Sequence, residues 1–146
     1  MSEKAAEPET KGPKALVPLL SKREADPAFI EALAGNQGEI ILLVVIDTNA
    51  MPGQFGFAAN DIAGGSQLME KIRDSLELVG KRCSDVIEWG DTAMKIEHLA
   101  LLRGVEKIFL VEQDNQYYKK LLRELKEKLG KIEFVEVRLP PEEKKR

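Results

Sequence analysis

The sequence predicts a doubly wound α/β fold, in which helices cover both faces of a five-stranded parallel sheet. Three observations predict this fold class. Residues Glu39–Asp47 contain seven consecutive apolar residues, as in a central strand covered on both faces. Strand-like and helix-like segments alternate from Ala15 to Leu139. Residues Ser84–Gln113 form a strand, a helix and a second strand, which implies a parallel pair with a right-handed crossover.

Composition excludes several classes of protein. The 146 residues have the size of one domain. The single Cys83 excludes an internal disulfide, and the first residues lack a signal-peptide core, so we expect a cytoplasmic protein. With 25 acidic and 22 basic residues, the chain lacks the cationic excess that nucleic acid binding needs. Its longest apolar run, Ile40–Ile46, is too short to span a membrane.

The two ends of the chain are polar and charged. We expect residues 1–12 to form a disordered tail, because they cannot bury enough apolar surface to offset the entropy of ordering. The folded domain is then expected to span residues 13–140. Residues 141–146 form a second charged tail.

Two elements precede the central strand. Ala15–Leu20 is an apolar run predicted as the first strand, although Pro18 conflicts with the rule that central strands avoid proline. Asp26 and Pro27 then supply the cap and the first residue of a short helix that ends at Gly35.

A long connection follows the central strand. Thr48–Gly65 is rich in Gly, Ala and Asn, and loops of this length are usually functional or disordered. Phe55 and Phe57 within it could cover a site or simply pack. Ser66 can cap the next helix, which ends before Gly80.

The third strand begins the next unit. Val86–Trp89 is a short β-type run, and Asp91 can cap the helix that Gly104 closes. Lys107–Val111 is apolar on both faces and forms the fourth strand.

The last helix and strand complete the pattern. Asp114 or Asn115 caps a helix with one apolar face that ends at Gly130. Ile132–Leu139 alternates apolar and charged residues, as suits a strand at the edge of a sheet.

This order and several local strings resemble the universal stress protein family. Leu16-Val17-Pro18 is similar to that family's opening strand, which commonly carries Val-Pro. Glu88-Trp89-Gly90-Asp91, with the string from Gly104 to Val111, resembles its third strand, third helix and fourth strand. The resemblance covers about Ala15 to Leu139 and implies the strand order 3-2-1-4-5. A receiver-like or flavodoxin-like domain is the alternative.

In such a sheet, ligands bind beyond the carboxyl ends of the strands where the winding reverses, here between strands 1 and 4. The candidate ligand-binding residues are therefore Leu20, Ser21, Asp47, Gly90, Asp91, Gln113, Asp114 and Asn115. Asp47 is either a ligand contact or a turn former at the end of its strand. Gly90-Asp91 either binds an anion or caps the following helix.

The resemblance also gives a test for nucleotide binding. Nucleotide-binding members of the family carry an Asp at the end of strand 1 and a glycine-rich segment after strand 4. Here Leu20 takes the place of that Asp, and residues 111–117 contain no glycine. Glu112 and Asp114 would add negative charge beside a phosphate. We therefore expect no cofactor and no tight ATP binding by the family's mode.

No motif identifies a reaction. The sequence has no P-loop, no dinucleotide fingerprint and no Ser-His-Asp order, and His98 lacks the partners of a metal site. We therefore expect a non-enzymatic regulatory or stress-related protein that acts through dimerisation and contacts with a protein partner or small ligand. One alternative binds adenine nucleotide at a relocated site built from Asp47, Gly90, Asp91 and Thr48–Gly65. A second alternative is an enzyme of unrecognised type.

The resemblance implies a homodimer, because family members often pair through their fifth strands. The residues expected at that interface are Phe134, Val135, Val137 and Leu139. An edge strand offers unpaired main-chain groups to a second copy. We therefore expect Val137→Pro, by removing one such N–H group, to leave a monomer.

Overall fold

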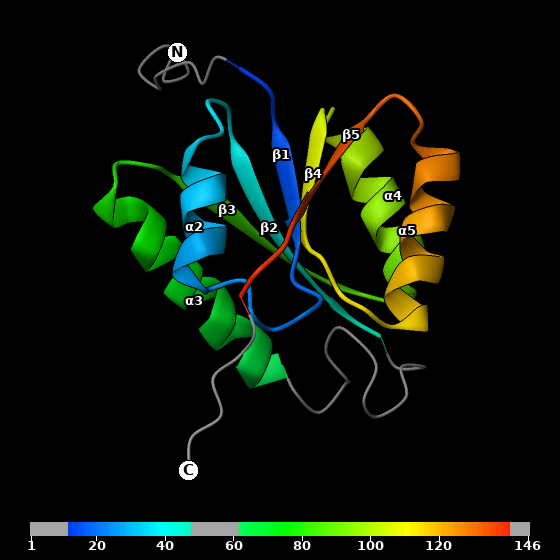
Figure 1. Cartoon of the computed structure of the whole chain (residues 1–146), viewed down its shortest axis with the longest axis horizontal. Helices are drawn as coiled ribbons and strands as arrows, with labels where there is room; N and C mark the ends of the chain where they lie inside the picture. Colours follow the sequence, from blue (N-terminus) through cyan, green and yellow to red (C-terminus); the bar gives the residue numbers. More distant parts are fainter. Residues whose placement is uncertain (1–11, 48–61, 141–146) are drawn as a thin grey trace.

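The computed structural model describes residues 12–47 and 62–140 of the chain and shows a parallel sheet between two layers of helices (Figure 1). The strands are Ala15–Pro18 (β1), Ile40–Ile46 (β2), Cys83–Trp89 (β3), Lys107–Val111 (β4) and Glu133–Val137 (β5). The helices are Pro27–Ala34 (α2), Ile62–Leu78 (α3), Thr92–Leu102 (α4) and Gln116–Lys128 (α5). The five strands lie in the order β3-β2-β1-β4-β5, all parallel, which confirms the predicted fold class and strand order.

The largest difference from the predicted elements is at the start of α3. This helix begins at Ile62, so the prediction that Gly65 lies in a loop and that Ser66 caps the helix is wrong. Gly65 is buried, and packing of the helix outweighs the low helix propensity of glycine. The predicted tails up to residue 11 and from residue 141, and the loop segment 48–61 with Phe55 and Phe57, lie outside the described residues.

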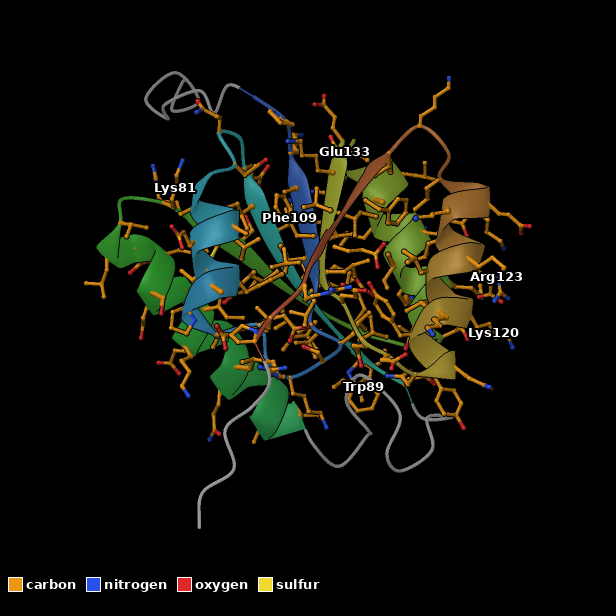
Figure 2. The ribbon with its side chains drawn as sticks, in the orientation of Figure 1. Lys81, Trp89, Phe109, Lys120, Arg123 and Glu133 are labelled. Atoms are coloured by element: carbon orange, nitrogen blue, oxygen red, sulfur yellow. The ribbon has the colours of Figure 1, made fainter. Side chains whose placement is uncertain are left out.

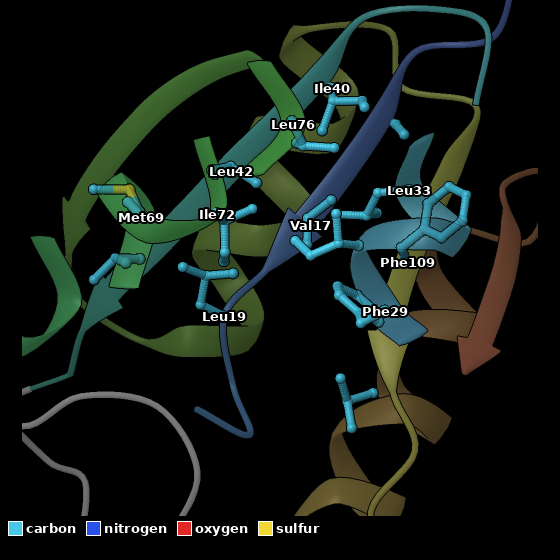
Figure 3. Close-up of a cluster of buried hydrophobic side chains, with 14 of the residues drawn as sticks. Val17, Leu19, Phe29, Leu33, Ile40, Leu42, Met69, Ile72, Leu76 and Phe109 are labelled. Carbon is cyan, nitrogen blue, oxygen red and sulfur yellow. The ribbon is translucent and has the colours of Figure 1, made fainter. Parts of the chain in front are cut away.

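The sheet separates two apolar cores. One lies between the sheet and α2 and α3 (Figure 3), and the other lies between the sheet and α4 and α5. Every residue of β2 is buried, which explains its unbroken apolar sequence. Within the described residues, no helix is long and apolar enough to cross a membrane.

Pro18 lies where β1 and β4 separate. The N–H groups of Ala15 and Leu19 donate to Glu39 and Leu43 on the β2 side, at 2.8 and 2.9 Å. Because hydrogen-bonding direction alternates along a strand, the nitrogen of Pro18 faces β4. The register between β1 and β4 ends at Leu16, opposite Ile108. The missing N–H therefore leaves the β2 ladder intact, and the conflict between Pro18 and a central strand disappears.

Candidate functional site

The predicted site lies at the carboxyl ends of β1 and β4, where the winding of the sheet reverses. The segment from Leu19 to Asp26 follows β1, and residues 112–115 follow β4. These two connections border the position at which a ligand of this fold class would bind. Their polar groups therefore decide what the site can hold.

A buried carboxylate shapes the connection after β1. Oε2 of Glu24 accepts hydrogen bonds from the N–H of Leu20 (3.1 Å), the N–H of Ser21 (2.9 Å) and the Ser21 hydroxyl (2.9 Å). The side chain is 1% exposed, and burial raises the pKa of Glu24, although the hydrogen bonds from Ser21 and Leu20 oppose the shift. Leu20 and Ser21 thus bind a carboxylate of their own chain.

Glu24 is a site residue that the sequence prediction missed. The string Ser21-Lys22-Arg23-Glu24 has the Ser-x-x-Glu pattern of a capping box, in which the glutamate binds the N–H of the serine. That bond is present here at 2.9 Å. The local signal for Glu24 was therefore available in the sequence.

Two carboxylates occupy the N-terminus of α4. Oδ2 of Asp47 accepts from the N–H (3.1 Å) and hydroxyl (3.0 Å) of Thr92. Oδ2 of Asp91 accepts from the N–H of Met94 at 3.0 Å, so Asp91 caps the helix. Capping was one of the two roles that the sequence predicted for Asp91. Gly90 makes the turn before the helix with φ of +142°, a conformation that glycine tolerates. An anion at this terminus would meet two negative charges.

Only four residues, 112–115, join β4 to α5. Asn115 caps α5, because its Oδ1 accepts from the N–H of Tyr118 at 2.7 Å. Its Nδ2 donates to Oε1 of Gln113 at 3.1 Å. The connection is short, and its amide side chains already bind one another and the helix.

The acidic side chains of this connection have partners within the chain. Oε1 of Glu112 accepts from Nε of Arg138 at 3.2 Å, and Oδ1 of Asp114 lies 3.2 Å from Nζ of Lys119. These ion pairs reduce the repulsion that a phosphate would meet from Glu112 and Asp114. The case against a phosphate site therefore depends on the length of the connection and its lack of glycine.

Three buried side-chain polar atoms have no hydrogen-bond partner in the part of the chain that the structure describes; Oδ1 of Asn36 lies near the amino end of β2, and the other two lie after β1 and β4. The latter two are Oε1 of Glu24, after β1, and Nε2 of Gln113, after the neighbouring strand β4. One can accept a hydrogen bond and the other can donate one. Each atom could bond to an uncharged polar group.

The described residues offer little for metal or nucleophilic chemistry. Within 12–47 and 62–140, no three His, Cys, Asp or Glu residues are placed to hold a metal ion. His98 is exposed on α4. Burial, with a smaller contribution from Asp85, raises the pKa of Cys83 to about 11, which keeps the thiol protonated and unreactive at neutral pH.

The residues predicted for the dimer interface pack against the two apolar cores; they are Phe134, Val135, Val137 and Leu139. The carbonyl of Val137 accepts from the N–H of Glu112 at 2.9 Å, so the main-chain groups of Val137 face β4. The prediction that Val137→Pro removes an unpaired edge N–H is therefore wrong. The outward N–H groups of β5 belong to Phe134 and Glu136, on the other side of the alternation.

A shallow hollow of about 280 Å³ lies between the end of α5 and the start of β5. Its lining residues are Lys126, Leu129, Gly130, Ile132 and Phe134. This is the amino end of the sheet, so the hollow is separate from the predicted ligand site.

Several solved structures are similar to this fold. The hypothetical protein PH0823 has a TM-score of 0.58 and 22% identity, covering 88% of this chain and 98% of that chain. The universal stress protein UspA from Lactobacillus plantarum has a TM-score of 0.55 and 18% identity, covering 89% and 99%. A universal stress protein family member from Burkholderia pseudomallei has a TM-score of 0.54 and 16% identity, covering 89% and 98%. No family model and no curated protein sequence matches the chain. At these identities the similarity shows the fold alone.

Proposed function

We propose that this chain, which has the fold of the universal stress proteins, is a non-enzymatic regulatory member of that family. In this proposal it works in the cytoplasm through self-association and through contacts with a protein partner or a small ligand. It does not hold ATP through a phosphate-binding loop. The observation that carries the proposal is the four-residue connection between β4 and α5, whose amide side chains bind one another and cap the helix.

The helix termini near the site support the negative part of the proposal. A phosphate is held by main-chain N–H groups that no other acceptor occupies. At α4, Asp47 and Asp91 accept from the N–H groups of Thr92 and Met94. At α5, Asn115 accepts from the first turn. A triphosphate would have to displace these side chains before it could bind.

An uncharged small ligand is the second candidate for the site between β1 and β4. Oε1 of Glu24 and Nε2 of Gln113 favour it, because an incoming donor and acceptor would satisfy both buried atoms. The relocated nucleotide site predicted around Asp47, Gly90 and Asp91 is less favoured. Both carboxylates there already bind α4.

Calorimetry tests the proposal directly. ATP with magnesium should show no micromolar binding to the full chain, and phosphate release from ATP should stay at the level of buffer. Micromolar binding would overturn the proposal. Adenosine serves as the uncharged probe: a rise in melting temperature that Gln113→Leu abolishes supports the second candidate, whereas a rise that Asp47→Ala abolishes supports the relocated site.

A further inference from the structure

The edge strand β3 offers main-chain groups on its outer side. The N–H of Gly90, directly after β3, donates to the carbonyl of Ile46 at 3.1 Å. Because hydrogen-bonding direction alternates along a strand, the main-chain groups of Asp85, Ile87 and Trp89 point away from β2. Within the described sheet no strand lies beyond β3. Such an edge is a template for a strand from another chain.

Two apolar side chains of this edge are exposed on the face that α3 covers. Cys83 packs against the core beneath α2 and α3, so every second residue after it along β3 faces the same layer. Ile87 and Trp89 belong to this set and are 39% and 51% exposed. Figure 2 shows Trp89 at the carboxyl end of the sheet. Edge strands are normally short or charged, so these two side chains mark a surface that another chain can cover.

One side of helix α3 borders the same edge. Arg73 of α3 pairs with Asp85 of β3. Burial raises the pKa of the Cys83 thiol most, and the negative charges of Asp85 and Glu77 raise it further. Glu77 therefore lies near the start of β3. Helix α3 and β3 run in opposite directions, because the later residue of the helix is beside the earlier residue of the strand.

The charges on this side of α3 are negative on balance. Glu70 lies one turn before Arg73 on the same side of the helix, and the direction of α3 places it beside the carboxyl half of β3. Glu70 and Glu77 are exposed, and no ion pair within the described residues neutralises them. Arg73 is already paired with Asp85. Lys81, just before β3, donates to a carbonyl that precedes β2. This border therefore attracts cations.

We propose that the outer edge of β3 binds a basic, extended segment of a protein partner, which adds to the sheet as an antiparallel strand. The proposal rests on the contact with a protein partner in the proposed function and names the surface for it. The residue of the segment opposite Ile87 is apolar and exchanges two main-chain hydrogen bonds with Ile87. The residues two positions before and after it are Arg or Lys.

The spacing of the charges supports this pattern. The two basic residues of the segment are four positions apart, about 13 to 14 Å along a strand. Glu70 and Glu77 are seven positions apart, about 10.5 Å along the helix, and long basic side chains span the difference. One cation meets Glu77 beside Asp85. The other meets Glu70 beside the indole of Trp89, where a cation–π contact is favourable.

A second copy of this chain fits the edge less well. Antiparallel pairing of two β3 strands about Ile87 would place Asp85 of each copy opposite Trp89 of the other. That is the face on which Glu70 lies, and like charges close together are destabilising. The edge therefore favours a segment with cations at these two positions.

A peptide with the matching pattern tests the proposal. The probe is acetyl-Thr-Arg-Thr-Val-Thr-Arg-Thr-amide, and the acidic control carries Glu in place of both Arg residues. Binding of the probe to the full chain should shift the emission of Trp89, the single tryptophan, to shorter wavelength, because the indole becomes covered. Calorimetry then gives the affinities. We expect the acidic control to bind at least about tenfold more weakly than the probe.

Removal of single N–H groups tests strand addition. Methylation of the valine nitrogen of the probe removes an N–H that faces β3 and should abolish binding. Methylation of the threonine after the valine removes an N–H that faces solvent and should leave the affinity largely unchanged. On the protein, Ile87→Pro removes the outward N–H and should abolish binding. Circular dichroism checks that this variant is folded.

Charge reversal on the protein tests the basic residues of the segment. Glu70→Lys should weaken binding of the probe by about tenfold, because a cation of the probe then meets a like charge. Glu133→Lys is the matched control, since it makes the same change of charge at the exposed start of β5. It should leave the affinity unchanged.

Five results would overturn the proposal. They are no binding of the probe at millimolar concentration, equal affinities for the probe and the acidic control, binding that survives methylation of the valine nitrogen, equal losses in Glu70→Lys and Glu133→Lys, or a shift of the Trp89 emission with protein concentration alone. The last result assigns the edge to a second copy. None of them affects the ATP experiment, so failure of this inference is distinguishable from failure of the proposed function.

Discussion

The two edge strands of this sheet differ in what they expose. β3 has seven residues and carries the exposed Ile87 and Trp89; Trp89 is labelled in Figure 2. β5 has five residues; its apolar side chains pack against the cores, while Glu133 and Glu136, and Arg138 directly after the strand, are exposed. Short, charged edge strands resist pairing with another chain. The comparison teaches that the two free edges of one sheet need not be equivalent, and that here β3 is the less protected.

The helices beside these edges differ in the same direction. The exposed side of α5 is mostly Lys and Glu with Arg123, and Tyr117 in its first turn is the one large apolar residue exposed there; Lys120 and Arg123 project from the helix in Figure 2. The exposed side of α4 carries Met94, Leu101 and Leu102. Both helices cover the same core, so burial on their inner sides does not explain the difference.

The largest contrast between the edges is expected from proline at Val137. Its main-chain groups bond to β4, so Val137→Pro should lower the free energy of unfolding by about 3 kcal/mol or more, through a lost ladder bond and an unpaired carbonyl. Ile87→Pro should cost only about 1 kcal/mol. The N–H of Gly90 donates to Ile46 of β2, so by alternation the N–H of Ile87 faces outward, where an edge strand accepts proline. Urea unfolding measures both. Equal losses would contradict the assigned direction of these groups.

A substitution after the central strand β1 gives a loss of unfolding free energy with which the losses at both edges can be compared. Glu24→Ala removes three hydrogen bonds and leaves the buried N–H of Leu20 unpaired, so we expect a loss of about 2–3 kcal/mol in unfolding free energy. An unchanged free energy of unfolding would contradict the stabilising role of these hydrogen bonds.

The pH dependence of stability follows from the same residue. Because burial raises the pKa of Glu24 in the folded state, its protonated form is favoured by folding. This contribution is fully present below the ordinary pKa of glutamate and is lost as pH rises through the raised value. Glu24→Gln should remove this part of the pH profile, and a profile that Glu24→Gln leaves unchanged would contradict the assignment.

The reaction rate of the Cys83 thiol measures how well the start of β3 is protected. With its pKa raised to about 11 from 9.0, Cys83 should react with iodoacetamide at pH 8 about a hundredfold more slowly than a free thiol. In urea the rate should rise to that of the unfolded chain. A fast reaction in the folded protein would show that the start of β3 opens readily.

The smallest effect is expected beside β5. The hydroxyl of the buried Tyr118 donates to Glu136 at 2.9 Å, and burial together with Glu136 raises the pKa of Tyr118. Tyr118→Phe should lower the free energy of unfolding by about 1–2 kcal/mol. Tyr117→Phe is the matched control, since Tyr117 is half exposed, and should cost less than about 0.5 kcal/mol. Equal effects of the two variants would contradict a stabilising role for the bond to Glu136.

The sequence was sufficient for the parts of the fold that depend on local patterns. The apolar run of β2 and the caps at Asp26, Asp91 and Asn115 were predicted and are present. The start of α3 was not predicted, because the burial of Gly65 in the helix outweighs the low helix propensity of glycine. At the site, the missing glycines after β4 were visible in the sequence. The carboxylate of Glu24 could have been found only from its spacing to Ser21.

By itself, the sequence determined the fold class and the short, glycine-free connection after β4, because periodicity and spacing are local properties of a chain. Only the tertiary structure decided which main-chain groups point outward on each edge and which apolar residues of α4 stay exposed. The physical reason is that these properties depend on strand register and on the neighbours that each element meets. The unequal edges emerge only when segments distant in sequence are brought together.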